Sequence, residues 1–191
     1  MNQKELWENF YRNNPRAWRG VSEIPVPCDG TALELGCGNG KTAAALLEAG
    51  MEVYGADFSE TAVKKCRELY PRAVFEVCDI SRLPFDDGMF DYVVAVHVIE
   101  NLEDEALEKT TAEIARVLKD GGYLFVRCFT PRDMRAGDRR NGLYYRYYSA
   151  EDIAELFEGM LLLESREKDE PTRFGTIRSR AECLFRKCKD A

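Results

Sequence analysis

The chain has 191 residues, of which 45% are hydrophobic and 32% charged, a composition and length typical of one soluble globular domain. Its formal net charge of -7 gives no general attraction to nucleic acid or to an anionic membrane. The longest apolar run, YVVAVHVI, is far shorter than the roughly 20 residues that span a bilayer, and the N-terminus has no apolar signal core. We therefore expect a cytoplasmic protein that partners neither nucleic acid nor membrane.

Cysteine and histidine usage gives no support for a metal site. The seven cysteines are odd in number, form no Cys-x-x-Cys motif and include several within apolar runs. Buried, reduced thiols explain this pattern best. His97 is the only histidine, so a site built from cysteine and histidine would be poorly supplied. We expect no metal.

Hydrophobic periodicity and capping residues predict an alternation of strands and helices. Ser59 and Ser149 are typical N-caps, and the apolar run that begins at Phe90 suits a central parallel strand covered on both faces. In chain order we expect a helix at 1–13, a strand at 31–36, a helix at 41–50, a strand at 52–57, a helix at 59–70, strands at 73–79 and 90–98, a helix at 103–122 closed by glycines, a strand at 123–129, a helix at 149–159, and a hairpin of strands at 161–168 and 177–187.

This alternation predicts an α/β fold with a single doubly wound sheet of seven strands, mostly parallel, with the terminal hairpin antiparallel. No repeat or linker divides residues 1–191, so we expect one domain, with a helical cap at 1–27 and a substrate lid at 130–148. In such sheets ligands bind at the carboxyl ends of the strands. The glycine-rich stretch LELGCGNGKT, residues 33–42, follows the first strand and is the expected ligand site.

Three chemistries use a glycine stretch of this kind. A P-loop needs glycine five residues before Gly40, where this chain has Leu35, so we reject a nucleotide triphosphate site. A dinucleotide turn needs a third small residue at the position of Lys41. That departure weakens the dinucleotide interpretation without excluding it, because Asp57 lies where an NAD-binding acid is expected.

Five segments in order carry a resemblance to a known family: ALELGCGNG, VYGADFS, VCDISRLPF, FDYVVAVHVIENL and RVLKDGGYLFV. Over most of its length the chain resembles the class I S-adenosylmethionine (SAM)-dependent methyltransferases, which have a Rossmann-like fold. The segment WENFYRNNPRAW is similar to the entry segment of small-molecule members, including tellurite- and thiol-type methyltransferases.

The resemblance implies SAM as cofactor and S-adenosylhomocysteine as product. Asp57 would accept hydrogen bonds from the ribose hydroxyls, Asp79 from the adenine amine, and Ile80 would pack on the adenine ring. Glu34 would help to hold the glycine turn and the methionine ammonium. The expected cofactor-binding residues are Glu34, Gly36, Cys37, Gly38, Asn39, Gly40, Asp57, Phe58, Asp79, Ile80, Tyr11 and Trp18.

The methyl acceptor is expected to be a small molecule. Five arginines and interleaved tyrosines between residues 131 and 147 favour an acceptor that is anionic or aromatic. His97, at the end of the expected central strand, is the candidate catalytic base. A structural role, packing beneath the lid, would explain a histidine at this position equally well. Two alternatives stay open: a SAM-binding module without catalysis, and an NAD-dependent oxidoreductase. The oligomeric state is also open.

Overall fold

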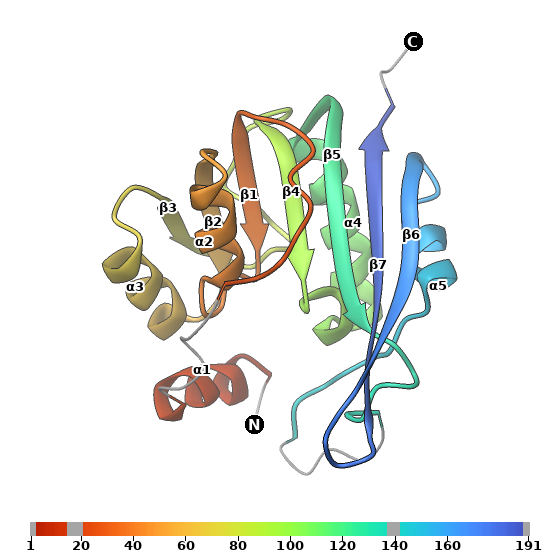
Figure 1. Ribbon diagram of the computed structural model, residues 1–191. Helices are drawn as coiled ribbons and strands as arrows, with labels where there is room; N and C mark the ends of the chain where they lie inside the picture. Colours follow the sequence, from red (N-terminus) through yellow and green to blue (C-terminus); the bar gives the residue numbers. More distant parts are fainter. Residues whose placement is uncertain (1–2, 15–20, 137–141, 189–191) are drawn as a thin grey trace.

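The computed structural model describes residues 3–14, 21–136 and 142–188, which form seven strands and five α-helices in alternation (Figure 1). Trp18, predicted to cover the cofactor, lies outside the described residues. The strands are β1 (Thr31–Leu35), β2 (Glu52–Asp57), β3 (Val74–Val77), β4 (Phe90–Val96), β5 (Leu118–Phe129), β6 (Met160–Pro171) and β7 (Ile177–Lys187). The helices are α1 (Gln3–Asn13), α2 (Lys41–Glu48), α3 (Glu60–Leu69), α4 (Asp104–Val117) and α5 (Ala150–Leu156), with a 3-10 turn, η2 (Ile99–Asn101).

The strands form one sheet in the order β3-β2-β1-β4-β5-β7-β6. The first five strands in this order are parallel, and β7 runs antiparallel to both β5 and β6. The predicted doubly wound, mostly parallel sheet with an antiparallel terminal hairpin is therefore confirmed. Strand order reverses beside β1, between β1 and β4, and this places a switch point at the carboxyl end of β1.

Two apolar layers hold the helices on opposite faces of the sheet. Along β4, Tyr92 and Val94 face α2 and α3, whereas Val93 and Ala95 face α4 and α5, as the period of two along a strand requires. All four side chains are fully buried. This double burial explains why the sequence of β4 is continuously apolar rather than alternating.

The largest error in the predicted boundaries lies between α4 and β5. The helix expected at 103–122 ends at Val117, and β5 begins at Leu118, five residues earlier than predicted. Leu118 is fully buried and pairs with Phe90 across an irregularity in the ladder. A side chain at Gly122 would collide with the backbone oxygen of Lys119, so the glycine permits a close approach within the strand rather than ending the helix.

Within the described ranges, no helix combines the length and apolar character needed to cross a membrane. The same ranges hold no group of three or more histidine, cysteine, aspartate or glutamate side chains arranged to bind a metal ion.

Candidate active site

The glycine stretch forms a tight turn between β1 and α2. Gly36, Gly38 and Gly40 have φ values of 59°, 43° and 69°, in the left-handed region that residues with a Cβ rarely adopt. A Cβ at Gly36 would collide with Val98, and one at Gly38 with the hydroxyl of Tyr11. The turn therefore brings bare backbone to the floor of the site, which is the arrangement expected for a ligand that approaches the main chain closely.

Glu34 holds the turn from within β1. Its carboxylate is buried, and Oε2 accepts a hydrogen bond from the backbone N–H of Ala43 at 2.9 Å. Helix α2 has no side-chain cap of its own, because its N-cap residue is Gly40. Glu34 thus satisfies an otherwise free N–H at the helix start. Burial raises the pKa of Glu34 to about 8, while the Ala43 and Thr42 hydrogen bonds oppose that rise.

Asp57, at the end of β2, joins the turn to the second strand. Its Oδ2 accepts from the N–H of Gly38 at 2.9 Å, and its Oδ1 accepts from the N–H of Ser59 at 2.8 Å. The residue is only 5% exposed. Burial raises its pKa to about 6. Each carboxylate oxygen keeps a second lone pair for a ligand.

Asp79 and Ile80 follow β3 on the same side of the cavity. Asp79 is exposed, and its Oδ1 accepts from the backbone and hydroxyl of Ser81 at 2.9 and 2.8 Å. Ile80 is 4% exposed. The structure therefore brings both predicted acids, with an apolar neighbour, to one wall of the site.

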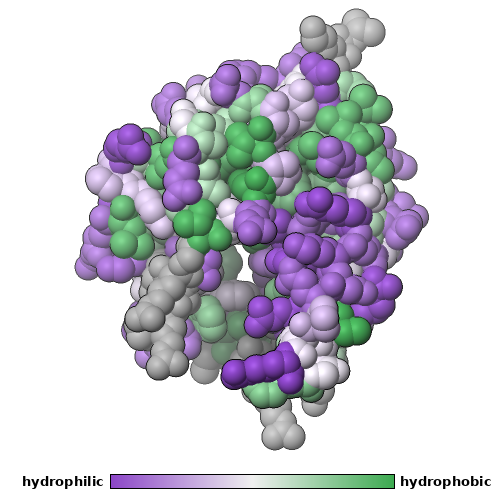
Figure 2. Space-filling view, in the orientation of Figure 1, coloured by the Kyte–Doolittle hydropathy of each residue, from purple (hydrophilic) through white to green (hydrophobic). Residues whose placement is uncertain are grey.

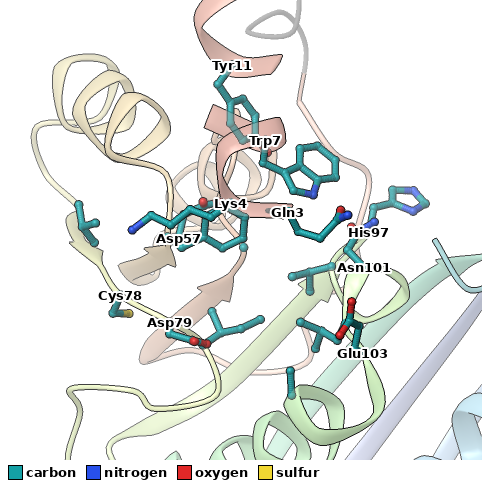
Figure 3. A pocket seen from close by; sticks show the side chains of 17 residues that line it. Gln3, Lys4, Trp7, Tyr11, Asp57, Cys78, Asp79, His97, Asn101 and Glu103 are labelled. Carbon is teal, nitrogen blue, oxygen red and sulfur yellow. The ribbon is translucent and has the colours of Figure 1, made fainter. Parts of the chain in front are cut away.

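Helix α1 forms the opposite wall and is tied to α3. The Glu8 carboxylate accepts from the hydroxyl of Ser59 at 2.6 Å and from the hydroxyl of Thr61. These bonds fix the helix so that Trp7 and Tyr11 point into the cavity (Figure 3). Burial and the nearby Asp57 carboxylate raise the pKa of Tyr11 well above its usual value. Tyr11 was predicted as a cofactor-binding residue, whereas Trp7 was not.

These elements enclose a cavity of about 520 Å³, a volume within the usual range for a small-molecule site. In Figure 3 side chains enter it from α1, from the ends of β2 and β3, and from the turn after β4. Of the predicted residues, Gly36, Asp57, Phe58, Asp79, Ile80, Tyr11 and His97 line it. Cys37, Gly38 and Gly40 are buried within the turn, Asn39 is half-buried, and Glu34 lies behind them.

Sequence reasoning missed several lining residues. Gln3 and Trp7 lie eight and four residues before the predicted Tyr11, a spacing that puts all three on one face of a helix and was a usable signal. Asn101 and Glu103 reach the cavity from the turn after β4 (Figure 3), a position that no periodicity marks.

His97 adopts an unusual conformation just beyond β4. Its φ is 57°, the only positive φ at a non-glycine residue in the described chain. Nδ1 lies 2.8 Å from Oε1 of Glu100, whose side chain is fully buried, and the imidazole stacks on Phe129 with ring centroids 3.9 Å apart. The Glu100 Oε2 atom is buried and has no hydrogen-bond partner among the described residues. The strained backbone of His97 and the buried carboxylate of Glu100 thus fix the orientation of the His97 imidazole.

The described parts of the predicted lid are anchored at both ends. Asp133, 3% exposed, accepts from the N–H of Ser179 on β7 at 2.8 Å. The segment beyond residue 141 is tied to α1, because Gln3 donates to the oxygen of Gly142 at 3.2 Å and accepts from the N–H of Tyr144 at 2.8 Å.

The described arginines of this segment pair with carboxylates of the chain itself. Arg132 pairs with Glu167, Arg135 with Asp133, and Arg146 with Asp104. The remaining two arginines, 139 and 140, lie outside the described residues.

Comparisons with known proteins agree with this geometry. A family model described as "Methyltransferase domain" matches residues 33–126. A probable S-adenosylmethionine-dependent methyltransferase of Mycolicibacterium smegmatis is 34% identical over 130 residues, which cover 66% of this chain and 49% of that protein. These matches support assigning residues 33–126 to the class I SAM-dependent methyltransferases. The glycine turn and the two acids coincide with the segments that carried the resemblance.

Two further relatives widen the comparison. A 2-methyl-6-phytyl-1,4-hydroquinone methyltransferase of Synechocystis is 36% identical over 122 residues, 62% of this chain and 37% of that protein. The chain therefore spans half or less of the length of both curated relatives. Burkholderia thailandensis 1,6-didemethyltoxoflavin-N1-methyltransferase, solved with S-adenosylhomocysteine and its acceptor, shares the fold with a TM-score of 0.69. It is 18% identical, and the match covers 97% of this chain and 80% of that one.

The residues around the cavity fit SAM. The turn offers backbone N–H groups and the start of α2 to a carboxylate, and Asp57 and Asp79 offer acceptors to hydroxyl and amine groups. Lys41 occupies the place where a dinucleotide turn needs a small residue. The cofactor expected from the sequence is SAM, and the family identifies it as such.

Proposed function

We propose that this chain transfers a methyl group from SAM to a small-molecule acceptor by in-line displacement. One observation carries the proposal: the glycine turn, Asp57 and Asp79 line a single cavity, and His97, which is paired with the buried Glu100, lines it too. The family membership supports the same reaction. Neither the cavity residues nor the related proteins favour an NAD-dependent oxidoreductase. A SAM-binding module without catalysis fits both, and only an activity measurement distinguishes it from a methyltransferase.

SAM, when bound, supplies an electrophilic methyl group on a sulfonium. We propose that Asp57 and Asp79 hold the ribose hydroxyls and the adenine amine, and that Ile80 packs on the ring. Trp7 and Tyr11 exclude water from the cavity, because α1 covers it. Orientation and exclusion of water supply much of the acceleration in a displacement of this kind.

His97 is proposed to accept the acceptor's proton. If Nδ1–H donates to Glu100, the neutral ring carries its lone pair on Nε2, which is then directed to the acceptor. Glu100 would stabilise the imidazolium that forms, as a buried carboxylate does for a catalytic histidine. In Figure 3 the imidazole projects away from Asp57 and Asp79. This supports separate roles, with the two acids binding the cofactor and His97 facing the acceptor.

The acceptor is proposed to be a small anionic or aromatic molecule. The names of the two relatives above, a hydroquinone and a didemethyltoxoflavin methyltransferase, indicate ring-containing small molecules for those proteins. The net charge of -7 argues against a nucleic-acid substrate. All seven cysteines are free thiols, which supports the proposal of a cytoplasmic location.

The test is release of S-adenosylhomocysteine from SAM with a panel of phenols, carboxylic acids, thiols and amines. Once an acceptor is found, His97→Ala is expected to reduce turnover by about 10²–10⁴-fold. Glu100→Gln should reduce turnover as well. Both variants should leave the SAM dissociation constant unchanged, because neither side chain is proposed to hold the cofactor.

Asn101→Ala, which changes a cavity residue in the same turn, is the matched control and should keep most of the turnover. SAM binding without product release for any class of acceptor would favour the non-catalytic module. Full turnover in His97→Ala would exclude His97 as the base and leave orientation of SAM and the acceptor as the source of catalysis.

A further inference from the structure

A second hollow lies on the face of the sheet opposite α4 and α5. It has a volume of about 810 Å³ and is bounded by the segment 21–25 and by β5, β7 and β6. In Figure 2 hydrophilic side chains gather beside a hollow, over the region where Figure 1 shows β7 and β6. We call it the hairpin groove. His97 borders both the hairpin groove and the cofactor cavity, so the two meet at the proposed base.

Strand register explains the lining of the groove. Arg127 on β5 pairs with Glu182 on β7, which pairs with Arg166 on β6, so these three side chains form one row across the sheet. Because alternate residues share a face, Arg178 and Arg180 project on the same side as Glu182. The intervening residues face α5 and the core.

The groove is cationic in an anionic protein. Six lysine or arginine residues and four glutamates line it, whereas the whole chain has a net charge of -7. The carboxylates are already shared: Glu182 pairs with Arg127 and Arg166, and Glu170 pairs with Arg180 as well as with Lys168. The glutamates therefore do not neutralise all the cations.

Two arginine groups face the groove without a complete set of partners. The Arg178 side chain makes no ion pair or hydrogen bond within the described residues. Arg180 reaches Glu170 through one terminal nitrogen, but its Nε is buried and has no hydrogen-bond partner in the described chain. A buried donor without an acceptor is costly, and a bound anion would satisfy it.

We propose that the hairpin groove binds the acceptor through an oxyanion, a carboxylate or a phosphate, held by Arg178 and Arg180. This rests on the proposed methyltransferase function, and it adds the place and the charge of the acceptor. His97 follows β4 and Arg180 lies on β7, two strands away, so their backbones are separated by roughly 10 Å. The acceptor then has its anionic group about that far from the atom that is methylated.

A purely structural role fits the row of Arg127, Glu182 and Arg166, since each charge there has a partner. It does not account for the buried Nε of Arg180, and Arg178 beside it is exposed and free to meet a ligand. The guanidinium fork matches the planar geometry of an oxyanion, which favours this class of ligand over a neutral one.

The experiment follows the side-chain Nε–H resonances of Arg178 and Arg180 by NMR in the full chain with S-adenosylhomocysteine. The probes are 4-hydroxycinnamate, its neutral amide and inorganic phosphate, each at the same ionic strength. We expect saturable shifts with 4-hydroxycinnamate or phosphate and none with the amide. The anion that saturates distinguishes a carboxylate acceptor from a phosphorylated one.

Arg178→Gln should weaken anion binding by about tenfold or more, as loss of a charged hydrogen bond predicts. Arg186→Gln, on the same strand but outside the groove, is the matched control and should bind like the parent. Where 4-hydroxycinnamate binds, its ring protons should show contacts with the His97 ring.

The proposal is overturned if neither anion gives a saturable shift, if the amide binds as well as the acid, or if Arg178→Gln binds the anion unchanged. Calorimetry with S-adenosylhomocysteine separates the two hypotheses. If S-adenosylhomocysteine binds and the anions do not, the acceptor assignment alone fails; if S-adenosylhomocysteine does not bind, the proposed function itself fails.

Discussion

Replacing Glu34 with glutamine tests the electrostatics of the glycine turn. Glu34 is 4% exposed, and burial raises the pKa of its carboxyl group to about 8 from an ordinary value of 4.5. A raised pKa means that the folded protein binds the proton more tightly than the unfolded chain does. The resulting stability is complete at acid pH, below the ordinary value, and is lost as the pH rises through about 8.

The magnitude follows from the pH window. Asp57 also has a raised pKa, of about 6, but in the folded protein it ionises mainly at lower pH than Glu34. Most of the stability lost above pH 6 therefore comes from Glu34. Between pH 6 and pH 8 the loss from Glu34 is therefore about 2 kcal/mol, because the slope of roughly 1.4 kcal/mol per pH unit falls off as Glu34 becomes half ionised near pH 8. Glu34→Gln keeps an acceptor for the N–H of Ala43 but has no proton to lose.

Urea denaturation at pH 6, 7, 8 and 9 measures the effect as the free energy of unfolding. The parent should lose stability over this range, and Glu34→Gln should lose less, becoming the more stable of the two at high pH. Glu48→Gln, an exposed position on α2, should follow the parent. Parallel profiles for the parent and Glu34→Gln would refute the proposed burial of a titrating carboxyl group.

Three further variants probe the wall and the floor of the site. Glu8→Ala removes the bonds to Ser59 and should increase amide exchange throughout α1 about tenfold, measured by hydrogen exchange; unchanged protection would mean that other contacts hold the helix. Gly38→Ala places a Cβ at a φ of 43° against the hydroxyl of Tyr11 and should lower the free energy of unfolding by about 1–2 kcal/mol, whereas an unchanged melting temperature would argue against this contact. Asp57→Asn should cost about 1–3 kcal/mol, because one of its two N–H donors would face an amide NH₂; a urea midpoint equal to that of the parent would exclude this role.

The sheet could be predicted because its signals are local. A continuous apolar run marked β4, glycine and serine marked the ends of α2 and α3, and the parallel order followed from the alternation of elements. The end of α4 was missed because Gly121 and Gly122 resemble a helix stop, while the pairing of Leu118 with Phe90 is non-local.

The candidate site was only partly predictable. Strand ends carrying Asp57 and Asp79 are visible in the sequence, but the burial of Asp57 depends on α1, which packs from a distant part of the chain. The contact of Glu100 with His97 was not predicted, because no pattern in the sequence shows that the two side chains meet. The hairpin groove had a signal in the alternating charges of 164–170 and 178–182, whose shared face is fixed only by the strand register.

Calorimetric titration tests the central claim, that the cavity beside the glycine turn binds SAM. The parent should bind SAM and S-adenosylhomocysteine saturably and NAD more weakly. Asp79→Ala should weaken SAM binding by about tenfold or more, the effect of losing a hydrogen bond to a charged group. It should leave the free energy of unfolding nearly unchanged, because the Asp79 side chain is exposed and, among the described residues, bonds only to Ser81. Tighter binding of NAD than of SAM, or an unaltered SAM affinity in a folded Asp79→Ala protein, would contradict the account.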